Sequence, residues 1–86
     1  MPALLIVHDI DDLDHWLTSP KRQELMAPHG YTVRTFVDPA DPSRVGLIVE
    51  GATLHDFEEL LKSGEALEAI KHDGVRADTV RVLEER

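Results

Sequence analysis

The feature that most constrains this fold is a pattern that occurs twice, in which a short apolar run leads directly into a helix start. Residues 5–8 (LIVH) are followed by Asp11 and Asp12, and residues 47–50 (LIVE) are followed by Thr53. Short runs rich in Ile and Val are typical of buried strands, and Asp and Thr are favoured helix N-caps. Because each helix leads on to a further strand, the sequence predicts two consecutive βαβ units.

Turn and helix-breaking residues set the expected boundaries of these elements. Ser19 and Pro20 divide the first helical region in two, because proline is favoured at the first position of a helix and disfavoured inside one. Residues 38–43 (DPADPS) predict a stiff turn with two prolines. We therefore expect strands over residues 3–8, 31–37, 44–50 and 79–83, and helical segments that begin near residues 12, 20, 53 and 65.

These elements predict an α+β fold of the ferredoxin-like, split βαβ type, as a single domain over residues 1–86. The four-stranded antiparallel sheet carries its helices on one face, and right-handed crossovers place the strand over residues 44–50 between the first two strands. Residues 4–7 are all apolar, which is typical of a strand covered on both faces. One chain has enough helix for one face only, so we expect a homodimer in which a second copy covers the other.

Composition narrows the classes of function. The chain has 86 residues, no cysteine and a formal net charge of -8 at pH 7. Disulfides, thiolate nucleophiles and zinc–thiolate sites are therefore excluded, and a small domain without cysteine is typical of the cytoplasm. Nucleic acid and anionic membranes are not expected as partners, because both require a basic surface. The apolar run over residues 3–7 is too short for a signal peptide or a membrane span.

Short motifs along nearly the whole chain carry a resemblance to a known superfamily. They are Val7-His8 with Asp12 and Trp16, Asp41-Pro42, Val49-Glu50, Ser63 with Leu67, Ile70 and Gly74-Val75, and residues 82–85. On these residues the chain resembles small bacterial proteins of the dimeric α+β barrel superfamily, which includes antibiotic-biosynthesis monooxygenases, haem-degrading monooxygenases, muconolactone isomerase-like proteins and polyketide cyclases. It looks most like a compact subgroup without assigned activities. The resemblance implies the ferredoxin-like fold and a dimer, but no single activity, because this fold carries unrelated chemistries.

The chain departs from these families at residues that carry their chemistry. In the cofactor-free and haem-degrading monooxygenases an asparagine works with a tryptophan, and this sequence contains no asparagine, so Trp16 lacks that partner. The nearest equivalent of the histidine–tyrosine pair of the cyclases is His8 with Tyr31.

His8 is the candidate catalytic residue, because it ends a strand that is otherwise wholly apolar. An imidazole can accept or donate a proton near neutral pH, and partial burial adjusts its pKa further. The alternative is a strand-end histidine that hydrogen-bonds a neighbouring backbone group or carboxylate. Trp16 has the spacing of an inward-facing helical residue, which predicts either a core residue or the wall of a cavity that stacks on a planar ligand.

The other candidate substrate-binding residues are Arg34, Phe36 and His72. Arg34 lies mid-strand on the same face as Phe36 and requires an anion, which is either an acidic residue of this chain or its partner, or a ligand carboxylate. Glu50 occupies the position equivalent to His8, but antiparallel strands separate the two by about 15 Å, so we expect a salt bridge or a rim contact with the partner subunit instead of an acid–base pair. The five histidines have neither His-x-His nor i,i+4 spacing, so we expect no metal site and no cofactor.

Two functions follow from these residues. The first is a small homodimeric protein that binds a small hydrophobic or aromatic ligand in a cavity between sheet and helices, or serves as a scaffold. The alternative is a cofactor-independent enzyme, namely a cyclase, isomerase or monooxygenase that acts on a planar aromatic or polyketide-like molecule. In that enzyme His8 would transfer the proton, Trp16 would stack on the substrate, and Arg34 or His72 would orient it.

Overall fold

The structure is a computed structural model that describes residues 2–86. Met1, the first residue of the predicted domain, lies outside the described residues. The elements in chain order are β1 (Ala3–Ile10), α1 (Leu13–Thr18), α2 (Lys21–Met26), the 3-10 turn η1 (Ala27–His29), β2 (Thr32–Asp38), β3 (Asp41–Glu50), α3 (Leu54–Leu61), α4 (Gly64–His72) and β4 (Val75–Glu84).

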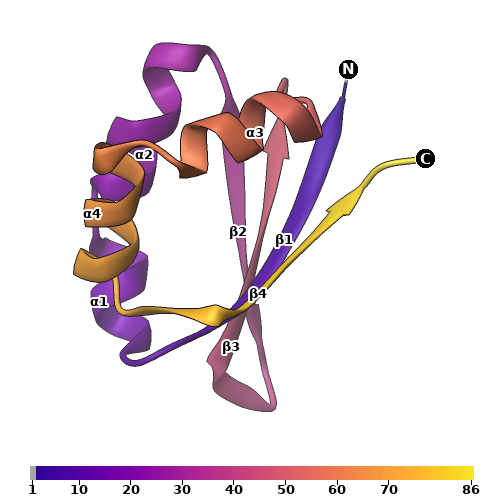
Figure 1. Cartoon of the computed structure of the whole chain (residues 1–86). Helices are drawn as coiled ribbons and strands as arrows, with labels where there is room; N and C mark the ends of the chain where they lie inside the picture. Colours follow the sequence, from indigo (N-terminus) through magenta and orange to yellow (C-terminus); the bar gives the residue numbers. More distant parts are fainter. Residues whose placement is uncertain (1) are drawn as a thin grey trace.

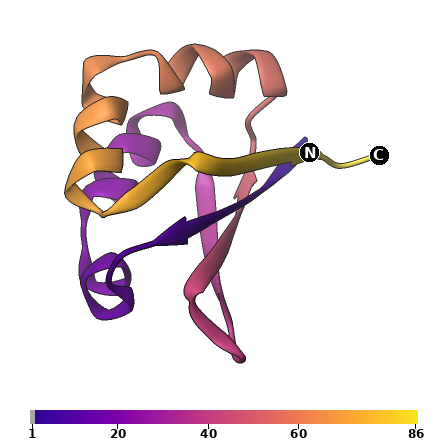
Figure 2. The same ribbon diagram turned by 60° about the horizontal axis from the view of Figure 1, so that its bottom comes forward.

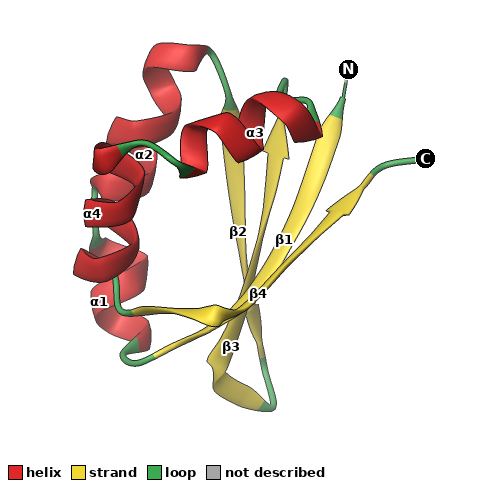
Figure 3. Cartoon of the chain, in the orientation of Figure 1, coloured by secondary structure: helices red, strands yellow, loops and turns green. Residues whose placement is uncertain are grey.

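The four strands form one antiparallel sheet in the order β2-β3-β1-β4. β3 therefore lies between β1 and β2, as right-handed crossovers predict. Figures 1 and 3 show all the helices on one side of this sheet, with the other side uncovered. The predicted ferredoxin-like α+β fold is confirmed.

Three strands are longer than the sequence predicts. β1 runs to Ile10 and not to residue 8, so His8 lies inside the strand and does not end it as predicted. β3 begins at Asp41 and not at residue 44, so only Pro39 and Ala40 separate it from β2. Pro42 is tolerated because β1 pairs with β3 only from Arg44 onward, which leaves the start of β3 with a single neighbour and an irregular register. β4 begins at Val75 and not at residue 79, and its first part is separated from the rest by an irregularity.

That irregularity is a bulge in β4 opposite His8. Val7 pairs with Arg81 and Asp9 pairs with Arg76, so residues 77–80 of β4 face His8 alone. The backbone N–H of Asp9 donates to the Thr79 side-chain oxygen at 2.8 Å. Bulges bend a strand away from its partner, and this one lies beside the cavity described below.

The two faces of the sheet differ in their side chains. Along β1 the residues that face the helices, Leu4, Ile6, His8 and Ile10, are all buried. They form the core with Val45, Leu47 and Val49 of β3 and with Trp16, Leu25, Met26, Ala52, Phe57, Leu60, Ala66 and Ala69 from the helical side. The uncovered face, which we call the open face, carries Leu5, Val7, Arg34, Phe36, Gly46, Ile48, Glu50, Arg81 and Leu83. Figure 2 shows the helices gathered on the other side of the sheet.

Side-chain caps and glycines fix the helix ends close to their predicted positions. Asp12 accepts a hydrogen bond from the His15 N–H, and Thr53 accepts one from the Asp56 N–H. Gly30 and Gly74 follow helical segments with φ of 74° and 70°, a left-handed conformation that favours glycine. The longest helix in residues 2–86 is α4 with nine residues, and none of the described helices is long and apolar enough to cross a membrane.

Candidate functional site

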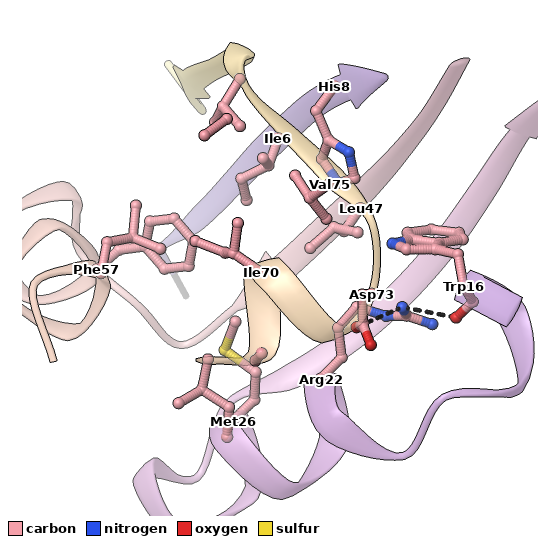
Figure 4. A pocket seen from close by; sticks show the side chains of 15 residues that line it. Ile6, His8, Trp16, Arg22, Met26, Leu47, Phe57, Ile70, Asp73 and Val75 are labelled. Carbon is pink, nitrogen blue, oxygen red and sulfur yellow. Dashed lines mark hydrogen bonds and ion pairs between the residues drawn. The ribbon is translucent and has the colours of Figure 1, made fainter. Parts of the chain in front are cut away.

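A cavity of about 320 Å³ lies between the sheet and the helices. Its walls are almost wholly apolar, and the side chains of Met26 and Phe57 are among them (Figure 4). Three polar groups, His8, Arg22 and Asp73, are part of its lining. The remaining lining residues are Ile6, Trp16, Leu25, Leu47, Leu61, Ala69, Ile70, Val75, Ala77 and Val80.

His8 reaches the cavity from β1 and is only 5% exposed. Burial lowers the pKa of its imidazole, and the hydrogen bond to the Asp9 carbonyl opposes this effect without cancelling it. Nδ1 lies 3.4 Å from the Asp9 carbonyl oxygen. In the neutral tautomer that donates from Nδ1, the lone pair is on Nε2. His8 is therefore a buried, neutral proton acceptor at neutral pH.

Trp16 is completely buried and forms a wall of the cavity. The capped helix α1 turns this residue toward the sheet, where its ring meets the ring of His8 edge to face at a centroid distance of 5.8 Å. The guanidinium carbon of Arg22 lies 4.0 Å from the centre of the indole, a cation–π arrangement. Trp16 thus combines the two predicted roles, core residue and cavity wall.

Arg22 and Asp73 form the charged part of the cavity. Arg22 Nη1 donates to the Trp16 carbonyl oxygen at 2.9 Å and lies 3.6 Å from Asp73 Oδ2 (Figure 4). Burial lowers the pKa of the Arg22 guanidinium, and the charge of Asp73 opposes that shift. Asp73 also accepts hydrogen bonds from the Ser19 hydroxyl and His72 Nδ1. The cavity therefore contains a compensated ion pair beside an aromatic wall.

Sequence reasoning did not identify Arg22 or Asp73 as site residues. One signal was present, because Asp73 is the C-cap of α4, where the helix dipole disfavours a negative charge. An acidic residue at that position requires a cation or hydrogen-bond donors. Arg22 lies 51 positions earlier in the chain, so no local pattern connects the two residues.

Two of the predicted substrate-binding residues lie on the open face, on the opposite side of the sheet from His8. Arg34 and Phe36 alternate along β2 with residues that face the helices. Arg34 Nε lies 3.5 Å from Glu50 Oε1, and both residues line a second, more open hollow. Glu50 pairs with Ala3 across β1 and β3, five residues from His8 along β1. Its expected salt bridge is thus present, at the opposite end of the strand from His8.

His72 and Tyr31 also lie apart from the cavity lining. His72 ends α4 with a half-exposed side chain, and its Nδ1 lies 2.9 Å from Asp73 Oδ1. Tyr31 stacks on His29 at a centroid distance of 5.4 Å, at the start of β2. The structure therefore brings together His8 and Trp16, and separates them from Arg34, Phe36, His72 and Tyr31.

Comparison with solved structures finds the same fold in several proteins of similar length. A protein from Bordetella bronchiseptica, provisionally named an antibiotic biosynthesis monooxygenase, aligns with a TM-score of 0.73 and 17% identity over 99% of this chain and 94% of that chain. A protein of the same provisional name from Nitrosomonas europaea aligns with a TM-score of 0.69 and 13% identity, covering 100% and 97%. A further antibiotic biosynthesis monooxygenase aligns with a TM-score of 0.64 and 15% identity, also covering 100% and 97%.

These identities establish a shared fold and do not transfer an activity. The sequence matches no known protein-family model and no curated protein.

Proposed function

We propose that this protein is a homodimer that binds a small, planar, mainly apolar molecule in the cavity between its sheet and its helices. The observation that carries this proposal is the apolar cavity of about 320 Å³ into which three polar side chains converge. A concave apolar site with a few placed polar groups is the usual form of a small-molecule site. A core packed to ordinary density leaves few voids larger than a water molecule.

The cavity lining favours an aromatic ligand with one polar end. Trp16 and Phe57 contribute aromatic rings to the lining, and His8 offers a hydrogen-bond acceptor next to Trp16. The Arg22 and Asp73 charges compensate each other, so the cavity has little excess charge to offer an ionic ligand. A phenol or an enol meets these requirements, because its ring packs on the apolar walls and its hydroxyl donates to His8.

The open face supports the homodimer. Leu5, Phe36 and Leu83 expose 38%, 47% and 54% of their surface on this face. Contiguous exposed apolar side chains on a sheet mark an interface, and two copies of the same face can pack around a two-fold axis. Arg34 and Glu50 would lie at the rim of that interface, where part of their exposed surface would be covered.

The second candidate function is a cofactor-independent enzyme that acts on the same ligand. His8 favours it, because a neutral imidazole buried beside a ligand hydroxyl or an acidic C–H group can remove its proton. The proton moves to His8 Nε2 and leaves an anion on the ligand. The solved structures of the same fold include proteins named as monooxygenases, which makes O2 the co-substrate to test first.

The binding experiment uses the only tryptophan of the chain, Trp16, as its reporter. Intrinsic fluorescence is titrated with phenol, 1-naphthol and a three-ring hydroxyaromatic compound, and we expect saturable quenching by at least one of them. Ala77 lines the cavity, so Ala77→Phe should weaken binding at least tenfold. Ala40→Phe, in the β2–β3 turn, is the matched control and should leave the affinity unchanged. Quenching that does not saturate, or that is unaffected by Ala77→Phe, would contradict the binding proposal.

A separate measurement tests the enzyme. O2 uptake and product formation are followed with each compound that binds, in the wild type and in His8→Ala. Turnover in the wild type that His8→Ala reduces at least a hundredfold supports catalysis. Saturable binding without turnover refutes the enzyme with these compounds and leaves the ligand-binding function standing.

A further inference from the structure

The structure brings together three potential metal ligands, His15, His72 and Asp73, of which only Asp73 also lines the cavity. His15 comes from α1, and His72 and Asp73 come from the end of α4, 57 positions further along the chain. One nitrogen of each imidazole and one carboxylate oxygen of Asp73 lie within 4.8 Å of one another. The sequence has no His-x-His or i,i+4 histidine spacing, and we therefore expected no metal site. Such local spacings do not describe ligands that come from two helices far apart in the chain.

The spacing of the two rings fits a shared cation. The centroids of the His15 and His72 rings are 4.9 Å apart. A Zn–N bond of about 2.0–2.1 Å places the metal about 3.2 Å from each ring centre, so a ligand–metal–ligand angle between 90° and 109° separates the centroids by about 4.5–5.2 Å. The observed separation lies inside this interval. The two rings therefore lie at a separation that allows both to bind one ion.

Hydrogen bonds already hold both rings in place. His15 Nε2 lies 2.6 Å from the His72 carbonyl oxygen, and His72 Nδ1 lies 2.9 Å from Asp73 Oδ1. Histidine ligands of metals ordinarily make a bond from one ring nitrogen to a carbonyl or carboxylate outside the coordination sphere, and the bond of His15 to the His72 carbonyl is of this kind. The bond of His72 joins it to Asp73, which is itself one of the three potential ligands. Both imidazoles are exposed, so a cation can reach them from solvent.

The surrounding charges favour a cation. Asp73 is 2% exposed and its carboxylate is held in position by the Ser19 hydroxyl. Arg22 Nη1 lies 3.6 Å from Asp73 Oδ2, whereas Asp73 Oδ1 is on the side of the carboxylate that faces His72. Asp12 caps α1 next to His15, and the whole chain has a net charge of -8. These groups lower the cost of placing a divalent ion at the cluster.

We propose that His15, His72 and Asp73 bind one divalent transition-metal ion of the zinc class. Two imidazoles and a carboxylate are a donor set that Zn²⁺ accepts, with water completing the tetrahedral coordination. The ion joins the start of α1 to the end of α4. Because Asp73 also lines the cavity, it connects this site to the Arg22 side chain that covers Trp16. This inference does not depend on the proposed ligand or on catalysis.

The test is a calorimetric titration of the full-length protein with Zn²⁺ in a buffer that does not chelate metals. We expect saturable binding of one ion per chain and visible absorption bands of tetrahedral Co²⁺ when cobalt replaces zinc. His15→Ala and His72→Ala should each weaken Zn²⁺ binding at least tenfold. His55→Ala is the matched control, since His55 is an exposed histidine on another helix, and it should bind as tightly as the wild type.

Thermal unfolding separates loss of the site from loss of the fold. His15→Ala and His72→Ala each replace an exposed side chain, so without metal both variants should melt close to the wild type. Zn²⁺ should raise the melting temperature of the wild type and of His55→Ala only. The inference is overturned if no saturable one-to-one binding occurs, or if His55→Ala weakens binding as much as His15→Ala does.

Discussion

The imidazole of His8 lies edge-on to the indole of Trp16, with 5.8 Å between ring centroids and an interplanar angle of 75°. Eight positions separate the two residues in the chain, and they come from β1 and from the helix that follows it. Aromatic pairs in this geometry attract each other beyond the area that they bury. The contact therefore ties α1 to the sheet and places both rings on the same cavity.

The free energy of unfolding should depend on pH in part because His8 is buried. Its pKa in the folded protein is lower than the unfolded value of about 6.5, so below that pH the unfolded chain binds more protons and folding becomes less favourable as the pH falls. Replacing it in His8→Gln removes this contribution. Urea unfolding at several pH values between 7 and 5 should therefore show a smaller loss of unfolding free energy in His8→Gln than in the wild type.

The comparison uses the difference between the two proteins, since they share every other titratable group. His55→Gln, at an exposed position, should follow the wild-type curve. Parallel curves for His8→Gln and the wild type would show that burial of His8 does not oppose its protonation.

Removal of the Trp16 side chain should destabilise the fold strongly. Trp16 is fully buried, and truncation of a buried tryptophan to alanine costs about 3–5 kcal/mol of unfolding free energy. Leu17→Ala is the matched control on the same helix, because Leu17 is 44% exposed and should cost less than about 1 kcal/mol. Urea unfolding followed by far-UV circular dichroism measures both, and equal losses would be inconsistent with Trp16 as the core residue of α1.

Breaking the Arg22–Asp73 ion pair should cost more than breaking an exposed one. Arg22→Met leaves the buried Asp73 carboxylate without its cation, and we expect a loss of about 2–3 kcal/mol of unfolding free energy. Arg76→Met breaks the 2.9 Å pair with Asp11, which is exposed on both sides, and should lower the unfolding free energy much less than Arg22→Met does.

A double-mutant cycle isolates the buried interaction. Arg22→Met with Asp73→Asn should be less destabilised than the sum of the single variants by about 1–2 kcal/mol. Additive effects would mean that Asp73 is stabilised by Ser19 and His72 without help from Arg22.

A charge on the open face should prevent the proposed dimer. Leu83→Glu places a carboxylate on the exposed apolar surface of β4, where we expect a monomer by size-exclusion chromatography with light scattering. Leu67→Glu is the matched control, because Leu67 is equally exposed, at 59% against 54%, but lies on α4 on the helical side. A wild-type protein that is monomeric at micromolar concentration, or equal behaviour of the two variants, would disprove this interface.

Local patterns predicted the elements of the fold well and their lengths less well. The caps at Asp12 and Thr53 and the glycine at position 30 act through neighbours within a few residues, so the sequence contains all the information they need. The start of β3 at Asp41 was missed because Pro42 is normally a turn residue, and only the lack of a β1 partner at that end of β3 allows it in a strand. The first part of β4 was missed because its bulge interrupts the alternating pattern.

Of the candidate site, the sequence predicted only the residues that lie on neighbouring elements of the chain. His8 and Trp16 belong to consecutive elements, and their positions in those elements sufficed to direct both toward the helix–sheet interior. Arg34 and Phe36 share a face as predicted, but a strand pattern does not state which face the helices cover. Asp73 and Arg22 meet from different helices, and no spacing rule describes that contact.

The sequence by itself determined the order of strands and helices, the ferredoxin-like sheet and the separation of His8 from Glu50, because each follows from short-range periodicity and from the handedness of the chain connections. The tertiary structure alone decided that a bulge in β4 lies opposite His8 and contributes to the cavity lining, that Arg22 covers Trp16 with Asp73 as its counter-ion, and that His15 meets His72. These contacts join residues far apart in the chain. They depend on how completely the side chains of different elements fill the space between them, which no local pattern records.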